Sequence, residues 1–469
     1  MARCTGKRLD DLHLSLSKRT IRKETESLGV VEGSLGQAVG RPDLYSSEKH
    51  SSTKGQQVIF MGTSLTGNCL RPLGPSEQYF WFSNQNSAKH FVIAAEITGD
   101  ATIATWISAV AAAQLRHPLL RVSVECGPDG PPFFREHANI PIPLRIVSEE
   151  EFAAWQVEMA KELATPIPLS SVPLARITLL RKSGRSTLIL SMHHSIADGL
   201  SSAFVIRDIL EALSGKLVQP LPLTEPQENL CSAAADPPPP PVPVYPAATL
   251  LRRTAGGPTV QALKLSKKLT MKLRTHAREV GATVHGALVA AFTFAGRQLF
   301  SDWLRHPVRV VSPVNNRRLL GLEDQCTLSI IFPTGAYTSD SQEHLWNVAR
   351  AVKDELTPVR TAQGLSTVFS GFRRLMSTSP DIAQIAAFEL QVCACEGMVS
   401  NLGVLPFETG FGGFKLESLW GPAVFVGIEG EQMIGAATAN GAIHLLHTSY
   451  TPIPKLLQTM EATLEAMAR

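Results

Sequence analysis

A pair of adjacent histidines, followed by an acidic residue and a glycine, is the feature of this sequence best suited to chemistry. The stretch reads Ser191-Met192-His193-His194-Ser195-Ile196-Ala197-Asp198-Gly199. Imidazole is the side chain whose ordinary pKa suits proton transfer near neutral pH. The carboxylate of Asp198 could orient an imidazole, or it could hold the loop by pairing with a distant arginine. The glycine beside it permits a tight turn.

The flanking segments place this stretch at the end of a strand. Apolar runs at 175–180 and 186–192 surround Lys182-Ser183-Gly184-Arg185 and predict a β-hairpin. Residues 200–213 have the period of an amphipathic helix. Because neighbouring residues of a strand point to opposite faces, we expect His193 and His194 to differ in role. One should face a cleft and the other the interior.

Three other interpretations of the histidine pair have to be weighed. A histidine is often a buried structural residue, although the doublet before Asp-Gly makes that less attractive. A metal site would need His193, His194 and Asp198 to converge, and no complementary cluster is evident, since Cys393-x-Cys395 is short and isolated. We therefore expect no metal site. A serine hydrolase of the α/β class would need a Gly-x-Ser-x-Gly elbow, which the sequence lacks.

The remaining pattern predicts two α/β halves joined by a proline-rich crossover. In the first half, residues 91–97 alternate as a strand, and Asp100 could cap a helix whose apolar face would hold Ile103, Trp106, Ile107, Val110 and Leu115. In the second half, Ser266 and Thr283 begin helices, 308–314 and 327–333 read as strands, and Asn440–Gly441 turns a hairpin.

These patterns divide the chain into four parts. Residues 1–57 are polar and are expected to form a disordered N-terminal tail. Residues 58–213 form an N-terminal lobe that carries the histidine pair, and 259–469 form a C-terminal lobe. Between them lies a linker at 214–258, in which residues 236–246 read DPPPPPVPVYP. Such a run favours an extended polyproline conformation.

Composition excludes several classes of function. The chain has 469 residues, 44% of them hydrophobic, and a net charge of +3 that is carried by residues 1–57. Residues 58–469 carry as many acidic as basic side chains. Nucleic-acid binding is therefore not expected, because it depends on basic side chains that neutralise phosphates. The sequence has no run of 18 apolar residues, so we expect no membrane span. Its first residues contain no apolar stretch, so we expect no secretory signal there. Seven scattered cysteines favour a reducing compartment, and we expect a cytoplasmic protein.

The stretch from His193 to Gly199 matches the HHxxxDG signature of the chloramphenicol-acetyltransferase-like superfamily. That group includes condensation domains of nonribosomal peptide synthetases, alcohol acetyltransferases, plant acyl-CoA-dependent acyltransferases and polyketide-associated acyltransferases. Upstream, Leu73-Gly74-Pro75-Ser76-Glu77 with Trp81 resembles the opening motif of condensation domains. Arg116-His117-Pro118-Leu119-Leu120-Arg121 resembles their RHxxLR motif.

Later segments extend the resemblance over about residues 70–450. Residues 265–292, followed by Ser312-Pro313-Val314-Asn315-Asn316-Arg317, are similar to polyketide-associated and mycocerosyl-type acyltransferases. Ser400-Asn401-Leu402-Gly403 resembles the SN-x-G segment of alcohol-acetyltransferase-like members. The DFGWG motif of the plant group is absent, which argues against that subgroup.

The resemblance implies a fold and a reaction. The fold would be α/β with two chloramphenicol-acetyltransferase-like lobes, each a mixed sheet flanked by helices, and an active-site tunnel at their interface. The reaction would move an acyl group from a thioester to an alcohol, with an alternative in which an amine acceptor gives an amide. The thioester, of CoA or of the phosphopantetheine arm of an acyl carrier protein, would be a co-substrate, and no permanently bound cofactor is expected.

The resemblance also assigns roles within the motif. His194 would be the general base, His193 a buried supporting residue, and Gly199 a residue that lets the loop pack tightly. Asp198 would be structural and paired with an arginine, for which Arg317 is preferred over Arg116. Oxyanion donors could come from Asn315, Asn316, Ser400 and Asn401, each of which could equally be a turn residue.

Two other classes of function remain open from the sequence. One is a non-catalytic protein of the same fold that docks carrier proteins, and the other is a metal-dependent hydrolase. The basic residues Lys264, Lys267, Lys268, Lys272, Arg274 and Arg278 could meet CoA or an acidic carrier protein, or could simply be a solvated helix face. We expect a monomer that contacts a small-molecule acceptor and no nucleic acid.

Overall fold

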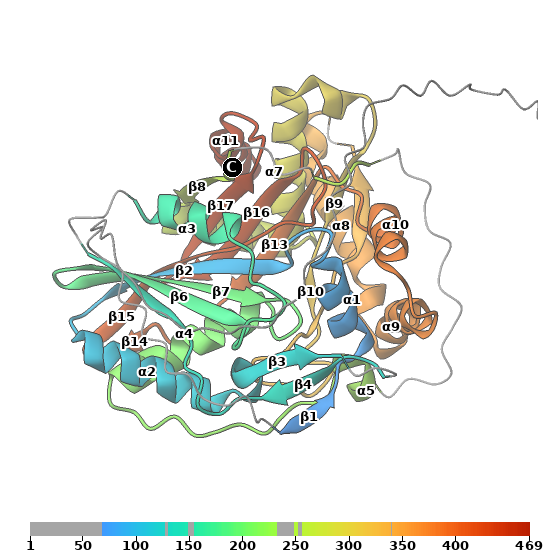
Figure 1. Ribbon diagram of the computed structural model, residues 1–469. Coiled ribbons are helices and arrows are strands. Elements are labelled where there is room, and N and C mark those ends of the chain that lie inside the picture. The colour runs from blue at the N-terminus through green and yellow to red at the C-terminus, as the bar shows by residue number, and fades with distance from the viewer. Residues whose placement is uncertain (1–67, 127–129, 149–153, 232–247, 252–255, 339) are drawn as a thin grey trace, which may run out of the picture. The chain divides into compact units, whose positions relative to one another are not determined.

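The computed structural model describes residues 68–126, 130–148, 154–231, 248–251, 256–338 and 340–469 (Figure 1). The expected tail at 1–57 and the proline run at 236–246 lie outside these residues. The described residues all lie in one compact unit.

The first of two large sheets carries the histidine pair. Its six strands lie in the order β14-β15-β2-β7-β6-β5, and only the β5–β6 pair is parallel. Their bounds are β14 (Gly410–Phe411), β15 (Phe414–Val424), β2 (His90–Thr98), β7 (Arg185–His193), β6 (Ala175–Lys182) and β5 (Leu144–Val147).

The second large sheet is built from the later part of the chain. Its order is β12-β9-β13-β16-β17-β8, and β13 runs parallel to both of its neighbours. The strands are β12 (Thr334–Tyr337), β9 (Val308–Val311), β13 (Gly397–Val404), β16 (Gln432–Ala439), β17 (Ala442–Ser449) and β8 (Thr259–Lys264). Two mixed six-stranded sheets flanked by helices confirm the predicted α/β class (Figure 1).

Two small sheets and a set of helices complete the described structure. β1 (Cys69–Pro72), β4 (Phe133–Glu136) and β3 (Val122–Glu125) form one small sheet, and β10 (Val314–Asn315) pairs with β11 (Ile330–Ile331). The α-helices are α1 (Pro75–Ser83), α2 (Ile103–Arg116), α3 (Trp155–Ala164), α4 (Gly199–Leu213), α5 (Gln227–Leu230), α6 (Lys267–Glu279), α7 (Val284–Leu299), α8 (Leu345–Leu356), α9 (Ala362–Ser377), α10 (Ile382–Val392) and α11 (Leu456–Met467). Short 3-10 turns lie at η1 (Pro118–Arg121), η3 (Ser301–Leu304), η4 (Gln342–His344) and η5 (Pro358–Arg360).

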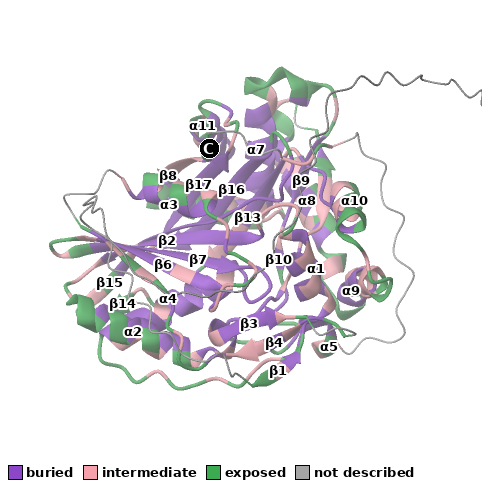
Figure 2. Ribbon diagram, viewed as in Figure 1, coloured by how far each residue is buried: buried purple, intermediate pink, exposed green. Residues whose placement is uncertain are grey.

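Strand β15 ties the later part of the chain to the first sheet. It runs antiparallel to β2, with Trp420 opposite Ala94 and Val424 opposite Phe91. The first sheet thus draws β14 and β15 from the chain beyond the proline-rich segment, so the two sheets do not divide the chain at that segment. Strands β16 and β17 are buried along their whole length (Figure 2).

Turn chemistry explains both predicted hairpins. β6 and β7 pair antiparallel around Gly184, which has a φ of 69°. β16 and β17 turn at Asn440 and Gly441, whose φ angles are 50° and 78°. A two-residue hairpin turn with positive φ at both positions favours Asn-Gly, because these residues tolerate that conformation best. Both hairpin predictions are confirmed.

The prediction for helix α2 was partly wrong. Thr102, not Asp100, caps the helix by accepting a hydrogen bond from the Thr105 N–H, while Asp100 accepts one from the Gly184 N–H at 2.8 Å. Trp106 and Val110 are buried as expected. The other three residues of the predicted apolar face are exposed, since the buried side is completed by small residues and one glutamine; those exposed are Ile103, Ile107 and Leu115.

Within the described ranges, no single helix has the length and apolar character needed to cross a bilayer. Helices α6 and α7 satisfy that criterion only as a pair, and the chain bends by 105° between them.

The contact between β16 and β15 leads to a stability prediction. A Cβ on Gly435 would lie 2.3 Å from the carbonyl oxygen of Pro422, so Gly435→Ala must push two buried strands apart. We expect a loss of about 1–3 kcal/mol in the free energy of unfolding, measured by urea denaturation.

Gly371→Ala is the matched control, because Gly371 lies in α9 with open space at its Cβ position. This substitution should be neutral or stabilising, by up to about 1 kcal/mol. Equal urea midpoints for the two variants would contradict the strand contact.

Candidate active site

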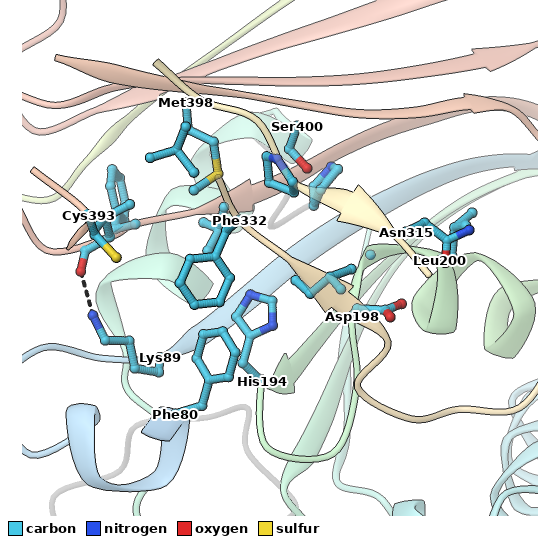
Figure 3. Close-up of a pocket in the computed structure, with 18 of the residues that line it drawn as sticks. Phe80, Lys89, His194, Asp198, Leu200, Asn315, Phe332, Cys393, Met398 and Ser400 are labelled. Atoms are coloured by element: carbon cyan, nitrogen blue, oxygen red, sulfur yellow. Dashed lines mark hydrogen bonds between the residues drawn. The ribbon is translucent and has the colours of Figure 1, made fainter. Parts of the chain in front are cut away.

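His194 occupies the turn between β7 and α4, directly after the last residue of the strand. Its backbone N–H donates to the carbonyl of Lys89 at 2.9 Å, which anchors the turn to the start of β2. Its ring lies against two phenylalanines, with centroid distances of 4.7 Å to Phe80 and 4.5 Å to Phe91. The imidazole is buried, and Figure 3 shows it beside the ring of Phe80.

The hydrogen bonding of His194 defines its tautomer. Nδ1 lies 3.2 Å from the carbonyl oxygen of Ala197. A carbonyl only accepts, so Nδ1 carries the proton and Nε2 keeps its lone pair. Burial lowers the pKa of His194 to about 4, although nearby Asp198 and the bond to Ala197 act in the opposite direction. At neutral pH the ring is therefore uncharged and can accept a proton at Nε2.

A cavity of about 140 Å³ opens beside this imidazole. A space of that size accommodates a group about as large as benzene. Its wall is drawn from segments far apart in the sequence and is mostly apolar, with His194 among the residues that line it (Figure 3); the others include Tyr79, Phe80, Asp198, Asn315, Phe332, Met398, Ser400 and Val424.

His193 is fully buried and is not part of the cavity wall. Its Nδ1 accepts from the backbone N–H of Ser195 at 3.1 Å and lies 2.8 Å from the Ser195 hydroxyl. Its ring meets Trp81 edge-on, at 5.9 Å between centroids. Burial lowers the pKa of His193 to about 3, so it too is neutral. The two histidines thus face different surroundings, as the alternation along a strand suggested.

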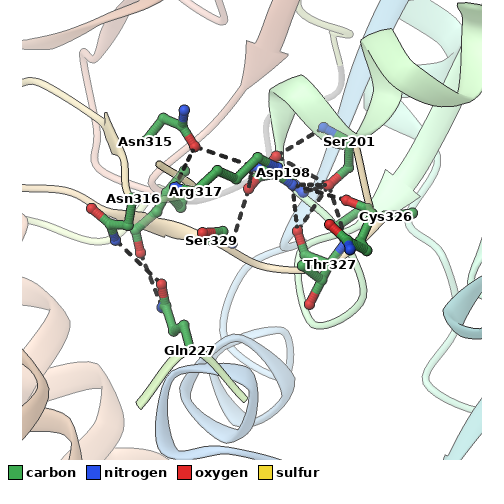
Figure 4. Close-up of polar contacts among 12 residues, drawn as sticks. Asp198, Ser201, Gln227, Asn315, Asn316, Arg317, Cys326, Thr327 and Ser329 are labelled. Atoms are coloured by element: carbon green, nitrogen blue, oxygen red, sulfur yellow. Dashed lines mark hydrogen bonds and ion pairs between the residues drawn. The ribbon is translucent and has the colours of Figure 1, made fainter. Parts of the chain in front are cut away.

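Asp198 is the N-cap of α4 and the centre of a buried polar network (Figure 4). Its Oδ1 accepts from the Ser201 N–H at 2.9 Å. Its Oδ2 accepts from Nη1 of Arg317 at 2.6 Å and from the Ser329 N–H at 2.9 Å. Both carboxylate oxygens are thus engaged by groups other than the His194 ring, whose own Nδ1 proton goes to Ala197. Asp198 therefore holds the loop and does not orient the imidazole.

Arg317 supplies the cation of this network and is itself buried. Its Nη2 donates to the Ser201 hydroxyl at 2.8 Å and to the Thr327 carbonyl at 3.0 Å. The other candidate, Arg116, lies elsewhere: it pairs with Asp208 at 2.9 Å and with Asp324 at 2.7 Å. The arginine preferred from the sequence is thus the one that pairs with Asp198.

Gly199 permits two later segments to approach the motif. A Cβ at this position would lie 2.8 Å from Leu402 Cδ2 and 3.2 Å from Pro422 Cγ. A larger residue would have to displace the Leu402 side chain and would press against Pro422. The glycine of the signature therefore serves close packing.

The four candidate oxyanion donors do not share one position. Asn315, Ser400 and Asn401 line the cavity, whereas Asn316 does not and instead donates to Gln227 Oε1 at 3.3 Å. The Asn401 side chain accepts from the Gly403 N–H at 2.9 Å, which is a turn contact. Asn315 Oδ1 accepts from the Arg317 N–H at 3.2 Å, which leaves its amide nitrogen available to a ligand.

The polar residues at one end of the cavity were not predicted from the sequence. Lys89 and Glu389 both line it, and their side chains form a buried ion pair. Glu389 is the only acidic residue in the apolar helix α10, and that isolation is a signal that could have identified it. Lys89 stands in a polar loop before β2 and carries no such signal.

No group of three or more histidine, cysteine, aspartate or glutamate residues in the described part of the chain is arranged to hold a metal ion. Cys393 and Cys395, the sequence pair considered for metal binding, are buried free thiols, and burial raises the pKa of Cys393 to about 12.

Two family models match successive parts of the chain. Residues 72–227 match the condensation domain, and residues 254–407 match the C-terminus of phthiocerol/phthiodiolone dimycocerosyl transferase. The histidine motif lies in the first segment and Arg317 in the second.

Curated relatives are large synthases of which this chain covers a small part. Tyrocidine synthase 3 of Brevibacillus parabrevis is 34% identical over 128 residues, which is 27% of this chain and 2% of that protein. Gramicidin S synthase 2 of Brevibacillus brevis is 36% identical over 110 residues, or 23% of this chain and 2% of that protein. The chain thus spans less than a tenth of either relative.

Solved structures share the fold over most of the chain. The first condensation domain of the CDA synthetase superposes with a TM-score of 0.60 at 16% identity, covering 85% of this chain and 96% of that one. Polyketide synthase associated protein 5 from Mycobacterium tuberculosis gives 0.57 at 17% identity, covering 85% and 98%. A trichothecene 15-O-acetyltransferase from Fusarium sporotrichioides gives 0.58 at 12%, covering 85% and 94%.

The buried pair at the centre of the site predicts a large effect of Arg317→Met. Removing the guanidinium leaves the fully buried Asp198 carboxylate without its cation. We expect a loss of about 3–5 kcal/mol in the free energy of unfolding, measured by urea denaturation.

Arg318→Met is the matched control, because Arg318 is the next residue and is exposed. It should change stability by less than about 0.5 kcal/mol. If both variants unfolded at the same urea concentration as the parent, the structural role of the pair would be refuted.

Proposed function

Because this chain belongs to the condensation-domain superfamily of chloramphenicol-acetyltransferase-like proteins, we propose that it transfers an acyl group from a thioester to an alcohol, forming an ester. The observation that carries the proposal is the state of His194. Its imidazole is uncharged, its Nδ1 proton is committed to Ala197, and its ring lines the cavity.

The reaction proceeds without a covalent enzyme intermediate. Nε2 of His194 takes the proton of the acceptor hydroxyl as the oxygen attacks the thioester carbonyl. When the carbon–sulfur bond breaks, the proton on Nε2 passes to the departing thiolate, so the products are an ester and a free thiol. A positioned base contributes roughly 10²–10⁴-fold to such a step. Holding both substrates in one cavity adds the advantage of proximity.

Asp198, Gly199, His193 and Arg317 act by holding the base in place. The Asp198–Arg317 pair fixes the start of α4, and this end of the helix follows the His194 turn by only four residues. The amide nitrogen of Asn315 and the hydroxyl of Ser400 line the same cavity and are suited to hydrogen bond the developing oxyanion.

Formation of an amide is the second candidate. It is favoured by the match of residues 72–227 to the condensation domain and by the curated relatives, which are tyrocidine and gramicidin S synthases by name. An amine acceptor would use the same base, because His194 would again take a proton from the nucleophile. A carrier protein as thioester donor belongs to both candidates, with CoA as the other donor, and the reaction calls for no permanently bound cofactor and no metal.

Replacement of the base is the direct test. The purified protein would receive acyl-CoA or acyl-carrier thioesters with panels of alcohols and amines, and products would be detected by mass. We expect His194→Ala to reduce ester formation by at least 10²-fold while the protein remains folded. His285→Ala is the control, since burial also lowers the pKa of His285 to about 4 but this residue does not line the cavity, and it should retain activity.

Unchanged turnover by His194→Ala would refute the assignment of the base. Loss of activity on treatment with a chelator, restored by a divalent cation, would instead favour the metal-dependent hydrolase.

The pH profile follows from the lowered pKa of His194. With a pKa of about 4, the free imidazole is deprotonated throughout the range from about pH 5.5 to 8. We expect kcat/KM to stay within about twofold across that range, because this parameter reports the protonation of the free enzyme. A fall in kcat/KM centred near pH 6.5, the ordinary pKa of histidine, would show a solvated ring and contradict the burial of the base.

A further inference from the structure

The wall of the cavity includes a charged pair that the proposed reaction does not use. Lys89 precedes β2, and Glu389 lies on α10; both side chains are almost fully buried and form an ion pair. In Figure 3, Lys89 lies on the side of the His194 ring away from Asp198 and Leu200. A buried ion pair is costly to desolvate and is weak evidence for stability by itself. Stability alone therefore does not explain why this ion pair lies in the cavity wall.

The donors of Lys89 are all committed within the protein. The ammonium group hydrogen bonds the Ser87 hydroxyl at 2.7 Å and the carbonyl of Val426, and it pairs with Oε1 of Glu389. An ammonium has three N–H donors and no acceptor. Lys89 is therefore fully satisfied and serves to hold the carboxylate.

Glu389, in contrast, has acceptor capacity to spare. Oε1 receives Lys89 and lies 3.3 Å from the Tyr79 hydroxyl, whose pKa is raised by burial so that it stays protonated and can donate. Oε2 is buried and has no hydrogen-bond partner among the described residues. A buried acceptor without a donor costs about 1–3 kcal/mol, so such a group is usually met by an ordered water or a ligand.

The charge balance around Oε2 selects the kind of donor. Lys89 already neutralises Glu389, and the nearby Glu431 carboxyl has its pKa raised to about 8 by burial, so it is mostly uncharged at neutral pH. A second cation would leave a net positive charge in an apolar wall. A neutral hydroxyl can donate one hydrogen bond to Oε2 without adding charge.

From this arrangement we propose that Glu389, held by Lys89, is a specificity residue that binds a hydroxyl group of the substrate other than the one that is acylated. The inference rests on the proposed acyl transfer and adds a substrate class to it. That hydroxyl is carried either by the acceptor or by the acyl chain, since both meet at the cavity.

The experiment compares matched substrates with and without the second hydroxyl. One series offers 1-hexanol and the 1,2- to 1,6-hexanediols as acceptors, and the other offers hexanoyl-CoA and its hydroxylated analogues as donors. A site built to bond a hydroxyl discriminates strongly against the analogue that lacks it. We expect at least one hydroxylated substrate to have a kcat/KM at least tenfold above its plain partner, and the series in which this occurs identifies the source.

The double variant Lys89→Met with Glu389→Leu should bring that ratio to within about threefold of unity. It removes the acceptor together with both buried charges, whereas the amide NH₂ of Glu389→Gln could still donate to the oxygen of a hydroxyl. Glu396→Gln is the control, because Glu396 pairs with Arg309 and does not line the cavity, and it should leave the ratio unchanged. If the double variant does not fold, Glu389→Gln should still lower the ratio, because a hydroxyl bonds a carboxylate more strongly than it bonds a neutral amide.

A binding measurement separates this proposal from the proposed function. Isothermal titration of His194→Ala with each hexanediol and with 1-hexanol, repeated with Lys89→Met and Glu389→Leu added, needs no turnover. A diol preference that these two substitutions abolish supports the acceptor subsite even if no acyl transfer is found. Absence of a hydroxyl preference in both turnover and binding, or a preference that survives both Glu389 variants, overturns the proposal.

Discussion

The ion pair between Asp198 and Arg317 is the contact on which the site depends. These residues are 119 positions apart in the chain, and both are buried. The pair joins the first turn of α4 to the segment after β10. Arg317 also bonds the Ser201 hydroxyl, and Asp198 also accepts from the Ser329 N–H. A buried ion pair is tolerated when hydrogen bonds satisfy its remaining donors and acceptors. Here those bonds fix the N-terminus of α4, and with it the turn that carries His194.

The environment of His194 combines two requirements that usually conflict. A base must be accessible to substrate, yet it must remain unprotonated and fixed in orientation. The rings of Phe80 and Phe91 exclude water from the faces of the imidazole, and the Ala197 carbonyl holds its one proton. The resulting low pKa makes His194 a weaker base than a histidine in water. It also keeps Nε2 unprotonated, and so able to accept a proton, at every physiological pH. In the proposed reaction, proximity would offset the lowered basicity, because both substrates would meet in one cavity.

The features that could be predicted from the sequence are those set by local patterns and motifs. The hairpins at Gly184 and Asn440–Gly441 follow from turn chemistry, and the pairing of Asp198 with Arg317 came from motif resemblance. The entry of β15 into the first sheet could not be predicted, since strand partners far apart in the chain leave no local signal. Helix α2 misled because its buried face uses Ala109, Ala113 and Gln114, while larger residues face outward. Lys89 and Glu389 were not predicted for a related reason. They are distant in the sequence and come together only in the wall of a cavity that the fold creates.

The two ends of the cavity treat charge in opposite ways. At one end, both oxygens of the Asp198 carboxylate accept hydrogen bonds from the protein. At the other, Lys89 is saturated while Glu389 retains a free oxygen in an otherwise aromatic and aliphatic wall. A protein that needed only an apolar wall there would do better with two packed hydrophobic residues, which avoid the desolvation of two charges. Retaining the charged pair makes physical sense if its unused acceptor discriminates between substrates, because an unmet polar group penalises the wrong ligand more than an apolar contact rewards the right one.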